Sequence, residues 1–272
     1  MEGPPTDETV SAALDTAATK HRGQKRKGSD LPYLVHPVAV AALAASCGGN
    51  AEQVAAALLH DTVEDCGGPP VLDEITSRFG PAIGKIVADC TVLPEPNRNW
   101  RHGKQRILEK LADLEPKSLL VAACDKLENA LSVYRDYLRL GEALWSRFSA
   151  GENAARWYYR SLGDVFGGHP NLQPARELVA VVEALEGRVR GDDSAKPRRE
   201  VSAWHGRWTP LKRDLVAQLR RRGEAGERDA GIALAYLSAT GLISQDEELA
   251  PAEWLARVGA PDMLVEMMDH RP

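Results

Sequence analysis

The segment LLHDTVED places two potential metal ligands and two further acids within six positions. His60 and Asp61 are adjacent, and on a helix their side chains would leave the axis about 100° apart, so both could reach one ion. Glu64 and Asp65 follow one helical turn later on the same face. This spacing predicts a metal site with a proton-handling carboxylate pair beside it.

Two residues elsewhere in the chain are candidates for the same ion. His36 in PYLVHP precedes Pro37, which biases it away from α-helical backbone and predicts a position at a helix N-cap. Asp125 follows the run LLVAAC, and a carboxylate that faces a core is costly unless it is paired or metal-bound. Each motif alone is more often structural. The ordered combination H…HD…D, followed by two acids, is hard to obtain by chance.

The elements that must position these residues are all predicted to be helices. The sequence is rich in Ala, Leu, Glu and Arg, and its apolar residues recur with helical period. Pro37 and Pro116 suit the first turn of a helix, and Gly48 and Gly67 suit helix ends. The expected helices cover about residues 7–21, 37–47, 51–66, 73–79, 82–90, 101–113, 116–138, 152–166 and 173–189, with three or four more after residue 204.

Composition predicts three segments. Residues 1–190 are expected to form the main domain, and the polar, charged stretch 191–203 a linker. Residues 204–272 are expected to form a small helical appendage, with Trp204, Trp208 and Trp254 in its core. Residues 188–228 hold twelve Lys/Arg against six Asp/Glu, which also marks the C-terminal part as distinct.

The motifs HRGQKRK, PYLVHP, AALLHDTVED and DKLEN, in this order over about residues 10–185, resemble the HD superfamily. Within it they are most similar to the alarmone hydrolases, that is, the hydrolase domain of RelA/SpoT homologues and its small stand-alone relatives. The resemblance implies an all-α HD-domain helical bundle, a single Mn²⁺ and removal of pyrophosphate from the 3′ position of (p)ppGpp. It also implies site residues, as follows. The metal ligands would be His36, His60, Asp61 and Asp125.

The resemblance further implies that Glu64 and Asp65 position or deprotonate the attacking water. Arg26 and Lys27 would hold the nucleotide, Asn129 would lie near the ribose and base, and Tyr158 would line the pocket wall. The chain departs from the family pattern at Glu128, where a His or an aromatic residue is usual, and at Gly28, where some relatives have a polar residue. Glu128 near the base pocket could change the nucleotide preference.

The chemistry of these residue types agrees with that reading. Imidazole and carboxylate ligands together suit a cation such as Mn²⁺, which would lower the pKa of a bound water. Glu64 or Asp65 would then take its proton. The basic cluster Lys20, Arg22, Lys25, Arg26 and Lys27 could clamp a polyphosphate, although composition alone favours a solvated loop.

The leading hypothesis is a small alarmone hydrolase that converts ppGpp and pppGpp to GDP and GTP, with a role as antitoxin to an alarmone synthetase left open. No synthetase activity is expected, because nothing after Gly191 indicates a mixed sheet. One alternative keeps the metal site but changes the substrate to ppApp, NADPH or a pyrophosphorylated tRNA 3′ end. Another is a non-catalytic nucleotide-sensing protein that binds a protein partner through its C-terminal appendage.

Bulk properties favour a cytoplasmic protein, and the resemblance implies a guanine nucleotide as its small-molecule substrate. No apolar run is long enough to span a membrane, and the start MEGPPTDETV lacks the features of a secretory signal. Four scattered cysteines without a CxxC pair indicate a reducing compartment. A net charge of −5 gives no general attraction to nucleic acid, the tRNA alternative aside.

Overall fold

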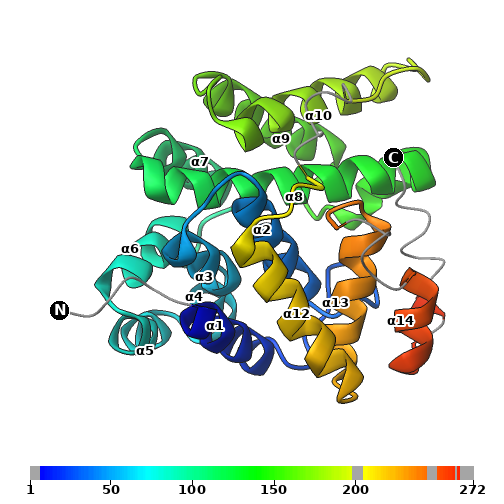
Figure 1. Ribbon diagram of the computed structural model, residues 1–272. Coiled ribbons are helices and arrows are strands. Elements are labelled where there is room, and N and C mark those ends of the chain that lie inside the picture. The colour runs from blue at the N-terminus through cyan, green and yellow to red at the C-terminus, as the bar shows by residue number, and fades with distance from the viewer. Residues whose placement is uncertain (1–6, 198–204, 244–249, 261, 264–272) are drawn as a thin grey trace. The chain divides into compact units, whose positions relative to one another are not determined.

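The computed structural model describes residues 7–197, 205–243, 250–260 and 262–263, and every regular element within these ranges is a helix (Figure 1). The expected all-α class is therefore confirmed. The chain forms two compact units. Unit 1 combines residues 1–91 with 204–272, and unit 2 consists of residues 92–203.

Unit 1 is built around helices α2 and α3. Every residue of α2 is buried, because a helix made almost entirely of Ala, Val and Leu can be surrounded on all sides. α3 packs against α1, α2 and α6. The helices of unit 1 are α1 (Asp7–Lys20), α2 (Val35–Ser46), α3 (Ala51–Leu59), α4 (Thr62–Cys66), α5 (Pro69–Phe79), α6 (Pro81–Cys90), α12 (Pro210–Glu224), α13 (Arg228–Ala239) and α14 (Pro251–Arg257).

The C-terminal helices belong to the same unit as the N-terminal ones. α12 packs against α1 and α2, and α13 packs against α2. This grouping differs from the expected division at residues 191–203, which set residues 204–272 apart as an appendage. Trp254 is buried as expected, whereas Trp204 and residues 198–203 of the expected linker lie outside the described residues.

Unit 2 is a smaller helical body. Its long helix α8 packs against α10, which also packs against α9, and α7 packs against α9. Arg156 on α9 donates two hydrogen bonds to Glu186 on α10, at 3.1 and 2.9 Å. The elements of unit 2 are α7 (Trp100–Ala112), α8 (Pro116–Leu140), the 3₁₀ helix η1 (Gly141–Arg147), α9 (Gly151–Gly167) and α10 (Gln173–Val189).

Two local predictions near the candidate site were wrong. The helix expected over residues 51–66 breaks after Leu59, and α4 begins at Thr62. Thr62 Oγ1 donates to the Leu59 carbonyl at 2.6 Å, and this is the carbonyl that would accept from the Val63 amide in a continuous helix. His36 lies inside the first turn of α2, with Leu34 at the N-cap, because Pro is tolerated anywhere in a first turn.

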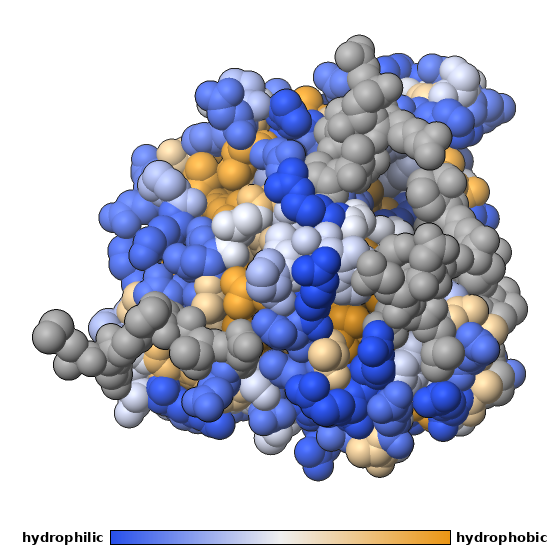
Figure 2. All heavy atoms as spheres, viewed as in Figure 1, coloured by the Kyte–Doolittle hydropathy of each residue, from blue (hydrophilic) through white to orange (hydrophobic). Residues whose placement is uncertain are grey.

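The visible surface is mostly polar (Figure 2). Among the described residues, Leu138 is the only large hydrophobic side chain that is classed as exposed. The described helices include none with the length and apolarity needed to cross a bilayer.

Candidate active site

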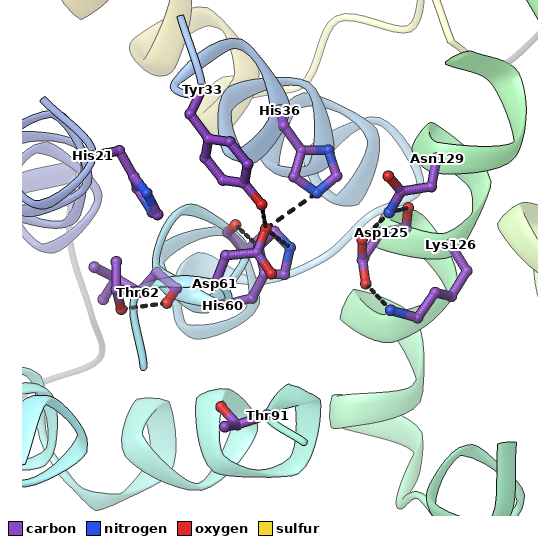
Figure 3. Close-up of polar contacts among 12 residues, drawn as sticks. His21, Tyr33, His36, His60, Asp61, Thr62, Thr91, Asp125, Lys126 and Asn129 are labelled. Atoms are coloured by element: carbon purple, nitrogen blue, oxygen red, sulfur yellow. Dashed lines mark hydrogen bonds and ion pairs between the residues drawn. The ribbon is translucent and has the colours of Figure 1, made fainter. Parts of the chain in front are cut away.

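His36 from α2, and His60 and Asp61 from the turn between α3 and α4, converge on one point of unit 1 (Figure 3). His36 Nε2 lies 3.3 Å and His60 Nε2 lies 3.1 Å from the same carboxylate oxygen, Asp61 Oδ2. Both imidazoles are buried, and their ring centroids are 5.1 Å apart. The break after Leu59 places His60 and Asp61 in a turn, from which both side chains reach this point.

The tautomer of His60 fits a metal ligand. His60 Nδ1 lies 2.8 Å from the Ala57 carbonyl, which can only accept, so Nδ1 carries the proton. In a neutral ring, Nε2 therefore presents its lone pair toward Asp61 Oδ2. Two electron-rich atoms facing each other at 3.1 Å require a proton or a cation close by. A backbone carbonyl that orients the ring in this way is a common support for a ligating histidine.

Tyr33 makes a third contact with the same carboxylate. Its Oη donates to Asp61 Oδ2 at 2.7 Å. Burial alone would raise the pKa of Asp61, but the neighbouring His60 and His36 bring that pKa well below its usual range. Burial and the charge of Asp61 raise the pKa of Tyr33, so its phenol remains a protonated donor. The site thus contains an ionised carboxylate supported by a neutral hydroxyl.

The acidic pair Glu64 and Asp65 lies on α4, directly after Asp61, and both residues are exposed. The Asp65 amide donates to the Asp61 carbonyl at 3.0 Å, which links the pair to the candidate ligand through the backbone. Desolvation by the protein atoms around its carboxyl group and the charge of Asp61 raise the pKa of Asp65, although the residue as a whole is exposed.

The basic loop after α1 is already partly engaged within unit 1. Lys20 forms an ion pair with Glu74 at 2.6 Å, and Lys25 forms one with Asp30 at 2.7 Å. Arg26 is half-buried and Lys27 is exposed. Two of the five residues expected to clamp a polyphosphate therefore have acidic partners inside the protein.

In unit 2, Asp125 is a buried residue of α8 whose carboxylate is held on both sides (Figure 3). Asn129 Nδ2 donates to Asp125 Oδ1 at 2.7 Å and to the Asp125 carbonyl at 3.1 Å. Lys126 Nζ forms an ion pair with Asp125 Oδ2. Asn129, expected near the ribose, thus orients the carboxylate one helical turn before it.

Tyr158 is a buried residue of α9 in an aromatic and basic cluster of unit 2. Its ring centroid lies 6.1 Å from that of Trp100, and the ammonium of Lys104 lies 4.6 Å from the Tyr158 centroid. Lys104 was not singled out from the sequence, although the interleaved aromatic and basic residues of WRHGKQR were a signal for it. Tyr33 was also missed, three residues before His36 in PYLVHP.

Comparison with known proteins shows a family match and several similar sequences. The family described as "HD domain" matches residues 13–148. The MESH1 protein of Mus musculus, named guanosine-3′,5′-bis(diphosphate) 3′-pyrophosphohydrolase, is 36% identical over 146 residues, which are 52% of this chain and 75% of the mouse protein. An Aquifex aeolicus protein, named guanosine-3′,5′-bis(diphosphate) 3′-pyrophosphohydrolase, is 36% identical over 140 residues, or 48% of this chain. The match spans only 19% of the Aquifex protein.

A solved structure described as a metazoan ortholog of SpoT that hydrolyses ppGpp is 20% identical to this chain. The aligned region covers 82% of this chain and 99% of the chain in that structure, with a TM-score of 0.47. That structural similarity is too low to add to the family match.

Proposed function

The chain belongs to the HD domain family, and on that basis we propose that it is a metal-dependent hydrolase that removes pyrophosphate from the 3′ position of ppGpp and pppGpp. The single observation that carries this proposal is the convergence of His36, His60 and Asp61 on one point. The 36% identity to a mouse protein with this named activity supports the substrate. Such an activity would release GDP and GTP in the cytoplasm, and could act as an antitoxin against an alarmone synthetase.

We propose His36, His60, Asp61 and Asp125 as the ligands of one Mn²⁺ ion. Two imidazoles and two carboxylates form a donor set of the hardness that Mn²⁺ accepts. The contact of His60 Nδ1 with the Ala57 carbonyl, which leaves Nε2 facing Asp61, supports its part in the set. Asp125 is included because of its place in the ordered motifs, and because Asn129 holds its buried carboxylate in one orientation.

The bound ion would supply an activated water and compensate negative charge on the reacting phosphate. Glu64 or Asp65 would accept the proton of that water, as exposed carboxylates within a few residues of Asp61. Arg26 and Lys27 would pair with the phosphates of the nucleotide. Tyr158 would line the pocket, with Lys104 over its ring as a further cation for phosphate.

The test is product analysis with the 272-residue protein, stripped of metal with EDTA and reloaded with Mn²⁺. Incubation with ppGpp is expected to give equal amounts of GDP and pyrophosphate, and His60→Ala and Asp125→Ala are expected to lose this activity equally. ppApp and NADPH in the same assay would identify a different preference. Full activity after EDTA treatment and desalting would rule the metal site out, and tight ppGpp binding without turnover would favour a nucleotide sensor.

A further inference from the structure

We infer that Tyr33 is a positioning residue that sets the orientation of the metal ligand Asp61. The inference rests on the proposed metal site and extends it to a residue outside the ligand set. Tyr33 lies in the loop before α2, six residues after the HRGQKRK segment ends at Lys27.

The contact is made at the oxygen that faces the imidazoles. Asp61 Oδ2 accepts from Tyr33 Oη at 2.7 Å and lies 3.1 Å from His60 Nε2 and 3.3 Å from His36 Nε2. A carboxylate oxygen has about two lone-pair sites. With one of them accepting the phenol proton, the other remains for an ion between the histidines. The hydrogen bond therefore holds the Asp61 carboxylate in one orientation relative to the two imidazoles.

The ring of Tyr33 is itself held in place. Its centroid is 4.8 Å from that of His21 and 5.9 Å from that of His36. The Tyr33 amide donates to the Gln24 carbonyl at 2.9 Å, and the Gln24 side-chain oxygen lies 2.7 Å from His21 Nδ1. His21 is buried, so this support is shielded from water.

The HRGQ segment thus supports Asp61 through Tyr33, a role separate from that proposed for Arg26 and Lys27. Groups that hydrogen-bond to metal ligands typically contribute about 10–100-fold to metal affinity. Removal of the Tyr33 hydroxyl should therefore weaken the metal site without changing any ligand.

The experiment compares the wild-type 272-residue protein with its Tyr33→Phe variant by calorimetric titration of the metal-free proteins with Mn²⁺. Tyr33→Phe is expected to bind Mn²⁺ about 10–100-fold more weakly. With ppGpp, the activity of this variant should be recovered as Mn²⁺ is raised, with KM unchanged at saturating metal. Tyr134→Phe is the matched control, because Tyr134 Oη donates to the Ala195 carbonyl at 2.9 Å in unit 2, and this variant should bind Mn²⁺ as the wild type does.

Equal Mn²⁺ affinity of Tyr33→Phe and the wild type would overturn the inference. If the wild type binds Mn²⁺ but does not hydrolyse ppGpp, only the proposed substrate is wrong, because the comparison of Mn²⁺ affinities does not depend on ppGpp hydrolysis. A wild type that binds no Mn²⁺ would overturn both. If Tyr33→Phe is unfolded in EDTA, His21→Ala serves instead, since it keeps the phenol but removes its stacking partner, and weaker Mn²⁺ binding is again expected.

Discussion

Lys212 Nζ donates a hydrogen bond to Ser46 Oγ at 2.8 Å, although the two residues are 166 positions apart in the sequence. The same ammonium also donates to the carbonyls of His205 and Arg207, and its side chain is fully buried. Ser46 is the last residue of α2, whose second residue is the candidate ligand His36. This contact therefore fastens the C-terminal part of unit 1 to the helix that positions His36.

Lys212 should make the stability of the protein depend on pH. Burial lowers the pKa of its ammonium from 10.5 to about 8. Between these two pKa values the unfolded chain binds more protons than the folded one, so the free energy of unfolding rises with pH across this window. The wild type should gain about 2 kcal/mol relative to Lys212→Met between roughly pH 7.5 and 9.5.

Urea denaturation of both proteins at the two pH values measures this difference. All other ionisable groups are common to the two proteins, so their contributions cancel in the comparison. Parallel dependence of the two stabilities on pH would contradict the assignment of this titration to Lys212.

Ser46→Ala should destabilise unit 1. The substitution removes one acceptor of a buried ammonium, at a cost of about 1–3 kcal/mol. Chemical denaturation at neutral pH measures it. Ser146→Ala is the control, because the exposed Ser146 hydroxyl donates only to the Ala143 carbonyl, and its loss should change stability by less than about 0.5 kcal/mol. Similar losses in the two variants would show that the Lys212 contact adds nothing.

Gly84 on α6 should not tolerate a side chain. A Cβ at this position would lie too close to Thr76 Oγ1 and 3.2 Å from Thr76 Cα on α5, so Gly84→Ala should cost about 1–3 kcal/mol. At Gly103 on α7, an added Cβ would have no heavy atom outside its own helix within 4 Å. Gly103→Ala should instead stabilise the protein by up to about 1 kcal/mol. Thermal unfolding separates the two, and stabilisation by Gly84→Ala would show that α5 and α6 are not packed this closely.

Mn²⁺ should stabilise the folded protein against heat. An ion that binds only the folded state adds about 2.7 kcal/mol when present at 100 times its dissociation constant. The melting temperature of the EDTA-stripped protein should therefore rise on addition of Mn²⁺, and that of His60→Ala should not. An equal rise in His60→Ala would place the ion at another site.

Asp65→Asn should separate proton transfer from metal binding. If Asp65 is the base, kcat should fall about 10²–10⁴-fold while Mn²⁺ affinity stays unchanged. Glu64→Gln is the paired measurement, because it changes the neighbouring exposed carboxylate. Unchanged kcat in both variants would exclude this pair from the reaction.

Much of the helical framework could be predicted from local sequence signals. Pro116 opens α8 and Gly141 follows its end, as their backbone preferences require. The break at His60 and Asp61 could not be predicted, because the apolar period continues through VAAALLHDTVED. In the structure the Thr62 hydroxyl donates to the Leu59 carbonyl at this break. Motif order predicted that His36, His60, Asp61 and Asp125 bind one ion. Within unit 1 the structure brings the first three together, and the four-ligand metal site stays a prediction.

The relationship between the ends of the chain could not be predicted either. Helical periodicity shows that α12 and α13 have an apolar face, but it does not show which other helix covers that face. Lys212 is buried in the structure, whereas a lysine in a basic segment is expected on the surface. Tyr33 was missed because its role depends on a turn 28 residues away.

The order of the chain through the two units has a consequence for biosynthesis. Unit 2 is encoded between the two portions of unit 1, so a ribosome completes residues 92–203 before α12 exists. Until then α2, an almost wholly apolar helix, lacks two of its covering neighbours, and the nascent protein must keep that surface from aggregating. A stop codon late in the message would therefore damage the first helices made, and with them the histidine at the start of α2.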